Sequence, residues 1–189
     1  MDLTAFLPLA KFIGIVCPTI YAGFTASDSL TFVSPIVLHA PNQKIMAKQW
    51  LAGYQYGPLW VPPLVMPGTI ANLLLAYACR HDSVLRNVYV AAAVAIFSIL
   101  PITFLYMEPG INGACKWKVQ LLLREEGFSM HETAWWFPSA HRQGGTLASR
   151  RWAERTDMRE LILFWRGTNN YRAVIAMVAV GLSGWGSLR

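Results

Sequence analysis

Four long apolar segments constrain this chain more than any other feature, because each is long enough to cross a lipid bilayer. A membrane-spanning helix needs roughly 17–25 mostly apolar residues. The segments are Leu3–Thr25, Pro58–Cys79, Val88–Met107 and Leu161–Gly184. Only 14% of the residues are charged, whereas soluble domains have about a quarter. The sequence therefore predicts an all-α, multi-pass integral membrane protein. We expect a four-helix bundle in which residues 1–189 form a single membrane domain with two sizeable extramembrane loops.

The first apolar segment is predicted to be a membrane span rather than a cleaved signal peptide. Only Met1 and Asp2 precede it, so the apolar run has no basic flank, and Lys11 interrupts it. Basic residues gather in the loop after the first span and in the loop after the third. The positive-inside rule would place both loops in the cytoplasm.

The fourth apolar segment opens with polar residues that share one helical face. Asp157 followed by Glu160 is a capping-box pattern, which predicts a helix start at this point. Trp165, Asn169 and Arg172 are spaced i, i+4, i+7 and therefore lie on one side of that helix. An arginine that enters hydrocarbon indicates a functional site. The alternative is that Arg172 marks the membrane boundary and reaches toward lipid headgroups.

The two predicted loops, residues 26–57 and 108–157, carry aromatic and histidine side chains. Trp50 and Tyr56 precede the second span, where an interfacial aromatic belt is also expected. The three cysteines are dispersed in apolar surroundings, which does not suggest a disulfide framework.

Histidines His131 and His141 lie in the third loop, without a third metal ligand at a usable spacing. We therefore predict no metal site. Aromatic and basic residues are not interleaved as they are on a nucleic-acid surface, so we expect no nucleic-acid partner.

Several short motifs, taken together and in order, resemble one known family. They are Met107–Lys118, Trp152–Met158 and the pattern Trp165-x3-Asn169-x2-Arg172. These motifs look like the fungal branch of the anthrone oxygenase family, which belongs to the DUF1772 group of small four-span membrane proteins. The resemblance runs from about residue 14 to residue 186.

The resemblance implies a membrane-bound oxygenase of secondary metabolism. Members of that branch oxidise an anthrone, an aromatic polyketide, with dioxygen to an anthraquinone. It implies a small aromatic polyketide as substrate, the lipid bilayer as surroundings and dioxygen as co-substrate. We expect an endomembrane location, with the endoplasmic reticulum as the first candidate.

The chemistry of an anthrone is compatible with a reaction that needs no cofactor. Removal of one proton from its doubly benzylic CH2 gives a delocalised anion, which can pass an electron to dioxygen. Recombination gives a hydroperoxide, and loss of water gives the quinone. The sequence has no dinucleotide-binding fingerprint and no haem-attachment motif. We therefore predict that no cofactor is required.

Such a reaction needs an aromatic slot, donors to the carbonyl oxygen and a base. The predicted walls of the slot are Trp50, Tyr56 and Trp165. The predicted catalytic donors are Arg172, Asn169 and Asn112. The base stays open among five side chains, which are His39, His131, His141, Glu108 and Glu154.

Two other classes of function fit the same features. One is a membrane cyclase or isomerase that moves protons on a related polyketide without using oxygen. The other is a non-enzymatic membrane component, such as a small-molecule carrier or an assembly partner. The two halves show no internal repeat, which disfavours alternating access within one chain. An oligomer is compatible with either class.

Overall fold

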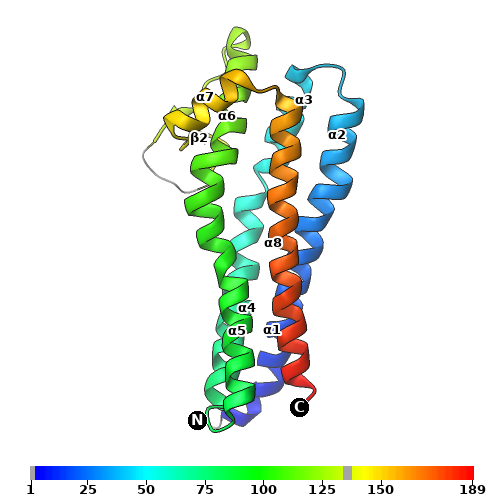
Figure 1. Ribbon diagram of the computed structural model, residues 1–189, viewed down its shortest axis with the longest axis vertical. Helices are drawn as coiled ribbons and strands as arrows, with labels where there is room; N and C mark the ends of the chain where they lie inside the picture. The colour runs from blue at the N-terminus through cyan, green and yellow to red at the C-terminus, as the bar shows by residue number, and fades with distance from the viewer. Residues whose placement is uncertain (1–2, 134–137) are drawn as a thin grey trace. The chain divides into compact units, whose positions relative to one another are not determined.

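The computed structural model describes residues 3–133 and 138–189, and these are almost entirely helical (Figure 1). The α-helices are α1 (Leu7–Ser27), α2 (Val33–His39), α3 (Gln43–Tyr54), α4 (Gly57–Ala78), α5 (Ser83–Pro101), α6 (Gly113–Leu123), α7 (Leu147–Arg155) and α8 (Met158–Ser187). Two π-helical segments, η2 (Asp28–Phe32) and η3 (Ile102–Asn112), and two short 3₁₀ turns, η1 (Leu3–Phe6) and η4 (Arg124–Glu126), join them. Two short strands, β1 (His131–Glu132) and β2 (Arg142–Gln143), pair in parallel. The all-α prediction is confirmed.

Several consecutive helical elements run on into one another, and in the described chain three such continuous helices are long and apolar enough to cross a membrane. They are Leu7–His39, Gln43–Ala78 and Ser83–Glu126. The first three predicted spans overlap them, which confirms an integral membrane protein. The fourth predicted span lies in α8, which is not among the three, because polar residues fill its first turns. A fourth membrane crossing therefore stays a prediction.

The two segments predicted as loops are largely helical. Residues 26–57 contain η2, α2 and α3, and residues 108–157 contain α6 and α7 together with the two strands. Local caps explain part of this, since the Asn42 side chain accepts a hydrogen bond from the amide of Ile45 in the first turn of α3. The predicted helix start at Asp157 is confirmed, because the Asp157 carboxylate accepts a hydrogen bond from the backbone N–H of Glu160 at 2.8 Å.

The chain divides into two compact units. Unit 1 consists of Met1–Thr25, Trp60–Leu100 and Tyr171–Arg189, and unit 2 consists of Ala26–Leu59 and Pro101–Asn170. Four helices, α1, α4, α5 and α8, contribute to both units, although α5 gives unit 2 only its last residue, Pro101. The single membrane domain stays a prediction.

Unit 1 is a bundle of four helical segments, drawn from α1, α4, α5 and α8. Its small apolar core includes Leu75 and Tyr89. Phe12 and Val94 are each 62% exposed, as expected for side chains that face lipid. A buried amide connects three of the helices: Asn72 donates to the carbonyl of Gly14, and the Ser183 hydroxyl donates to the Asn72 oxygen at 2.7 Å.

Unit 2 contains the larger core, in which α6 packs against α3 and α7. Fully buried members of this core include Trp50, Met107 and Leu161. Figure 1 shows α7 lying beside α6. This unit also buries two charged side chains, Glu108 and Lys116.

Candidate functional site

A buried carboxylate lies in the π-helical segment η3 of unit 2. The chain enters η3 after Pro101, and Pro109 lies inside it. A proline lacks the N–H that an α-helix needs and crowds the preceding turn, so the helix widens. Widened turns of this kind occur frequently at functional sites. Here the widened segment carries Glu108, whose side chain has no exposure to solvent.

Three donors converge on the Glu108 carboxylate. The Tyr54 hydroxyl donates to Oε2 at 2.6 Å, and the Asn112 amide donates to the same oxygen at 3.0 Å. The Lys116 ammonium forms an ion pair with Oε1. Charge-assisted hydrogen bonds of this type are about twice as strong as neutral ones. The Glu108 carboxyl group is therefore enclosed by the Lys116 ammonium and two neutral donors.

Lys116 is buried as completely as its partner. Besides the carboxylate, its ammonium donates to the carbonyl of Ser139 at 3.2 Å and to the carbonyl of Arg142 at 3.0 Å. It also lies 5.5 Å from the centre of the Tyr54 ring, within range of a cation–π interaction. All three donor positions of the ammonium are thus satisfied within unit 2.

Aromatic rings cover this centre on one side. The Trp50 ring stacks on Tyr54 with centroids 4.9 Å apart, and Trp165 meets Trp50 edge-on at 6.0 Å. The Trp165 N–H donates to the Asn112 oxygen at 3.1 Å, which joins the rings to the polar centre. The Trp50 N–H is buried and has no hydrogen-bond partner among the described residues. This is an unusual position, because buried donors are rarely left without a partner.

Several predicted site residues come together at this centre. Asn112, Trp50, Trp165 and the base candidate Glu108 all lie in it. Tyr56 does not: its side chain is 53% exposed and lines a neighbouring cavity.

The two other predicted donors lie elsewhere in the chain. Asn169 is buried in unit 2, near the point where α8 passes into unit 1. Arg172 is in unit 1, with its guanidinium 5.6 Å from the Tyr21 ring centre. The predicted roles of both residues stay predictions.

The other four base candidates have exposed side chains. His39 ends α2, and His131 lies in β1. Glu154 forms an ion pair with Arg150 one turn earlier on α7. His141 is exposed but lines two cavities. Of the five candidates, Glu108 is therefore the one whose carboxylate is enclosed by donors.

Sequence reasoning missed Tyr54 and Lys116. A signal for both was present, because Glu108, Asn112 and Lys116 recur at intervals of four and so lie along one helical face. Tyr54 follows Trp50 by the same interval.

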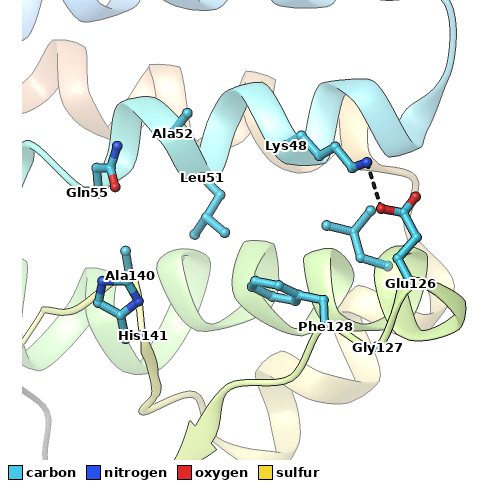
Figure 2. A pocket seen from close by; sticks show the side chains of 10 residues that line it. Lys48, Leu51, Ala52, Gln55, Glu126, Gly127, Phe128, Ala140 and His141 are labelled. Carbon is cyan, nitrogen blue, oxygen red and sulfur yellow. Dashed lines mark ion pairs between the residues drawn. The ribbon is translucent and has the colours of Figure 1, made fainter.

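Two cavities lie beside the buried centre in unit 2. The larger has a volume of about 530 Å³ and is bounded by α3, the end of α6 with residues 126–128, and Ala140 with His141 (Figure 2). The smaller, about 400 Å³, shares Gln55, Ala140 and His141 with it. Both volumes fall within the range of small-molecule sites.

No three metal-ligating side chains of the histidine, cysteine or carboxylate kind cluster in the part of the chain that the structure describes. The three cysteines are free thiols. The absence of a metal from the reaction stays a prediction.

The fold and the site together define an integral membrane protein with a buried glutamate–lysine pair in its helical interior. The family model described as anthrone oxygenase matches residues 50–182, well over half of the chain. The chain therefore belongs to the anthrone oxygenase family. Neither a curated protein nor a solved structure matches it. All members of the buried centre, from Trp50 to Trp165, lie inside the matched region.

Proposed function

We propose that this protein is a membrane-bound oxygenase that oxidises an anthrone-type aromatic polyketide with dioxygen to the corresponding anthraquinone. The observation that carries the proposal is the Glu108 carboxylate, which is fully buried and bound by Tyr54, Asn112 and Lys116 within the region matched by the family. The carboxylate is the candidate general base for proton removal from the substrate, because it is enclosed in the interior of unit 2.

In the proposed reaction, Glu108 accepts a proton from the CH2 group of the anthrone. The resulting anion gives one electron to dioxygen, and the two radicals combine to form a carbon–oxygen bond. The peroxide anion takes the proton back from Glu108, and the resulting hydroperoxide loses water, so one oxygen atom enters the quinone and the other leaves as water. Lys116 and Tyr54 hold the carboxylate in place for the transfer.

The growing charge on the substrate's carbonyl oxygen needs a donor. The Trp50 N–H is the first candidate in unit 2, because it is buried and no described residue accepts from it. Asn169 remains the second. Stabilisation of an oxyanion by one such donor is typically about 2.7–4 kcal/mol. Loss of most turnover in Asn169→Ala, and separately in Arg172→Met, with normal membrane insertion would support the roles predicted for these side chains.

The first experiment measures oxygen uptake by the purified protein, from which metal has been removed with a chelator. The protein is supplied with emodin anthrone, and the spontaneous background is subtracted. A protein-dependent burst with one quinone formed per dioxygen consumed is the expected result. Isomerisation or cyclisation without oxygen uptake would instead favour the non-oxidative class. Activity that returns only when a metal is added would contradict the cofactor-free mechanism.

The role of Glu108 is tested with a pair of variants. Glu108→Gln alone leaves the Lys116 cation buried without its partner, so a loss of activity there could reflect unfolding. The double variant Glu108→Gln/Lys116→Met removes both charges and is expected to fold. We expect it to lose about 10²–10⁴-fold in kcat, the usual contribution of a general base. Full activity in a folded double variant would exclude Glu108 as the base.

We further propose that the protein resides in an endomembrane, with the endoplasmic reticulum as the first candidate. Fractionation of the full-length protein expressed in its native host would test this location.

A further inference from the structure

The larger cavity of unit 2 has an unusual distribution of polar groups (Figure 2). Leu51 from α3 and Phe128 from the chain after α6 point into its middle. At one end lie Lys48 and Glu126, which form an ion pair at 2.6 Å. At the other end lie Gln55 and His141. The cavity is therefore apolar in the middle and polar at both ends.

This cavity adjoins the buried centre through two shared elements. On α3, Trp50 and Tyr54 face the Glu108 centre, whereas the intervening Leu51 and the next residue, Gln55, line the cavity.

The second shared element is the segment of residues 139–142. Its first and last carbonyls accept hydrogen bonds from Lys116, and the two residues between them, Ala140 and His141, line the cavity. The ammonium that holds Glu108 therefore also fixes the opposite wall of the cavity.

We infer that this cavity is the recognition site for the polyketide, a flat fused-ring aromatic molecule with polar substituents at both ends. The apolar middle suits the rings, and the ion pair at one end and the amide and imidazole at the other suit phenol and carbonyl oxygens. Its neighbour, which reaches Tyr56, extends the site beyond Gln55. This inference rests on the proposed function, because it assigns a binding place to the aromatic substrate of that reaction.

The inference separates recognition from chemistry, and the two are tested by different variants. Ala52 lines the cavity and is exposed, so Ala52→Trp fills the space without disturbing the core. Ala148 is an exposed helical alanine on α7 that lines none of the described cavities, so Ala148→Trp is the matched control. The probe for binding is emodin, the quinone, because it does not turn over.

Titration calorimetry in detergent gives the dissociation constant of emodin, and oxygen uptake gives KM and kcat. For Ala52→Trp we expect emodin binding and KM to worsen by about tenfold or more, a change of about 1.4 kcal/mol, with kcat nearly unchanged. Phe128→Ala should weaken binding by a smaller factor, because it removes one ring contact. Ala148→Trp should match the parent protein, including any partition of emodin into micelles.

The outcomes distinguish this inference from the proposed function. Unchanged emodin binding and KM in Ala52→Trp would overturn the recognition site, even if the protein is an active oxygenase. Absence of emodin binding to the parent protein would overturn it as well. Emodin binding that Ala52→Trp abolishes, in a protein that consumes no oxygen with emodin anthrone, would support the recognition site and contradict the proposed reaction.

Discussion

The two units bury polar groups in different ways. In unit 1 the Asn72 amide bridges Gly14 and Ser183, and every member of that cluster is neutral. In unit 2 a carboxylate and an ammonium, Glu108 and Lys116, are buried together. A neutral hydrogen-bonded cluster holds helices together at little cost. A buried ion pair is expensive to desolvate and is often no more stable than an apolar replacement.

This difference indicates a division of labour between the units. Unit 1 exposes large apolar side chains and satisfies the Asn72 amide internally, and its buried arginine, Arg172, lies against the Tyr21 ring. Unit 2 keeps a charged pair that stability alone does not explain. We therefore propose that the proton transfer takes place in unit 2, and this contrast between the units can be tested from the largest expected effect to the smallest.

Breaking the ion pair should have the largest effect on stability. Lys116→Met leaves the Glu108 charge buried without its cation, at a cost of about 3–5 kcal/mol in the free energy of unfolding. The double variant Glu108→Gln/Lys116→Met should recover most of that loss. Denaturant unfolding in detergent measures both. A double variant as unstable as the single one would show that the pair is a structural requirement rather than a functional one.

Removing the tyrosine hydroxyl should have an intermediate effect. Tyr54→Phe deletes the 2.6 Å hydrogen bond to the carboxylate and keeps the ring that stacks on Trp50. Hydrogen bonds to charged groups contribute about 1.5–3 kcal/mol. We expect a loss of stability in that range together with a lower kcat. Unchanged kcat would mean that the position of the carboxylate does not depend on this bond.

Removing the neutral cluster of unit 1 should cost less and leave the chemistry intact. Asn72→Leu deletes the hydrogen bonds to Gly14 and Ser183. Hydrogen bonds between membrane helices average about 0.6 kcal/mol and reach about 1.7. The measurements are the unfolding free energy and kcat. The value of kcat should stay within about twofold of that of the parent protein, a change in activation free energy of less than about 0.6 kcal/mol. A large fall in kcat would contradict the assignment of the chemistry to unit 2.

The smallest effect is expected on the surface of α7. Glu154→Gln removes one partner of the ion pair with Arg150, in which both side chains are about half exposed. Exposed pairs one turn apart contribute about 0.3–0.5 kcal/mol. Turnover should be unchanged as well, since the carboxylate faces solvent. Loss of turnover in a stable Glu154→Gln protein would return this residue to the list of bases.

Part of the fold could be predicted because it depends on local composition. A long apolar run that crosses a membrane must be helical, because a helix satisfies all backbone hydrogen-bonding groups within the segment. This reasoning located three of the membrane helices. It failed for the segments read as loops, where helices such as α3 and α6 are stabilised by burial against one another rather than by an apolar run.

Some members of the candidate site were predictable from the sequence, but their arrangement was not. The resemblance selected Asn112 and Trp165, and Glu108 was among the possible bases. Their meeting depends on the widened turn of η3 and on the packing of α3 beside α6, which bring Tyr54 and Lys116 to the same carboxylate. These partners lie 54 and 8 residues from Glu108, and a pairing over the longer separation leaves no local pattern.

The sequence by itself determined the class of the protein, because hydrophobic length and charge placement act on each segment independently of the rest. It also determined the family, through the order of its short motifs. Only the tertiary structure decided which of five candidate bases is enclosed by donors and that the same lysine holds both the carboxylate and a cavity wall. The physical reason is that burial and ion pairing are properties of groups brought together in space, which spacing along one helix cannot specify.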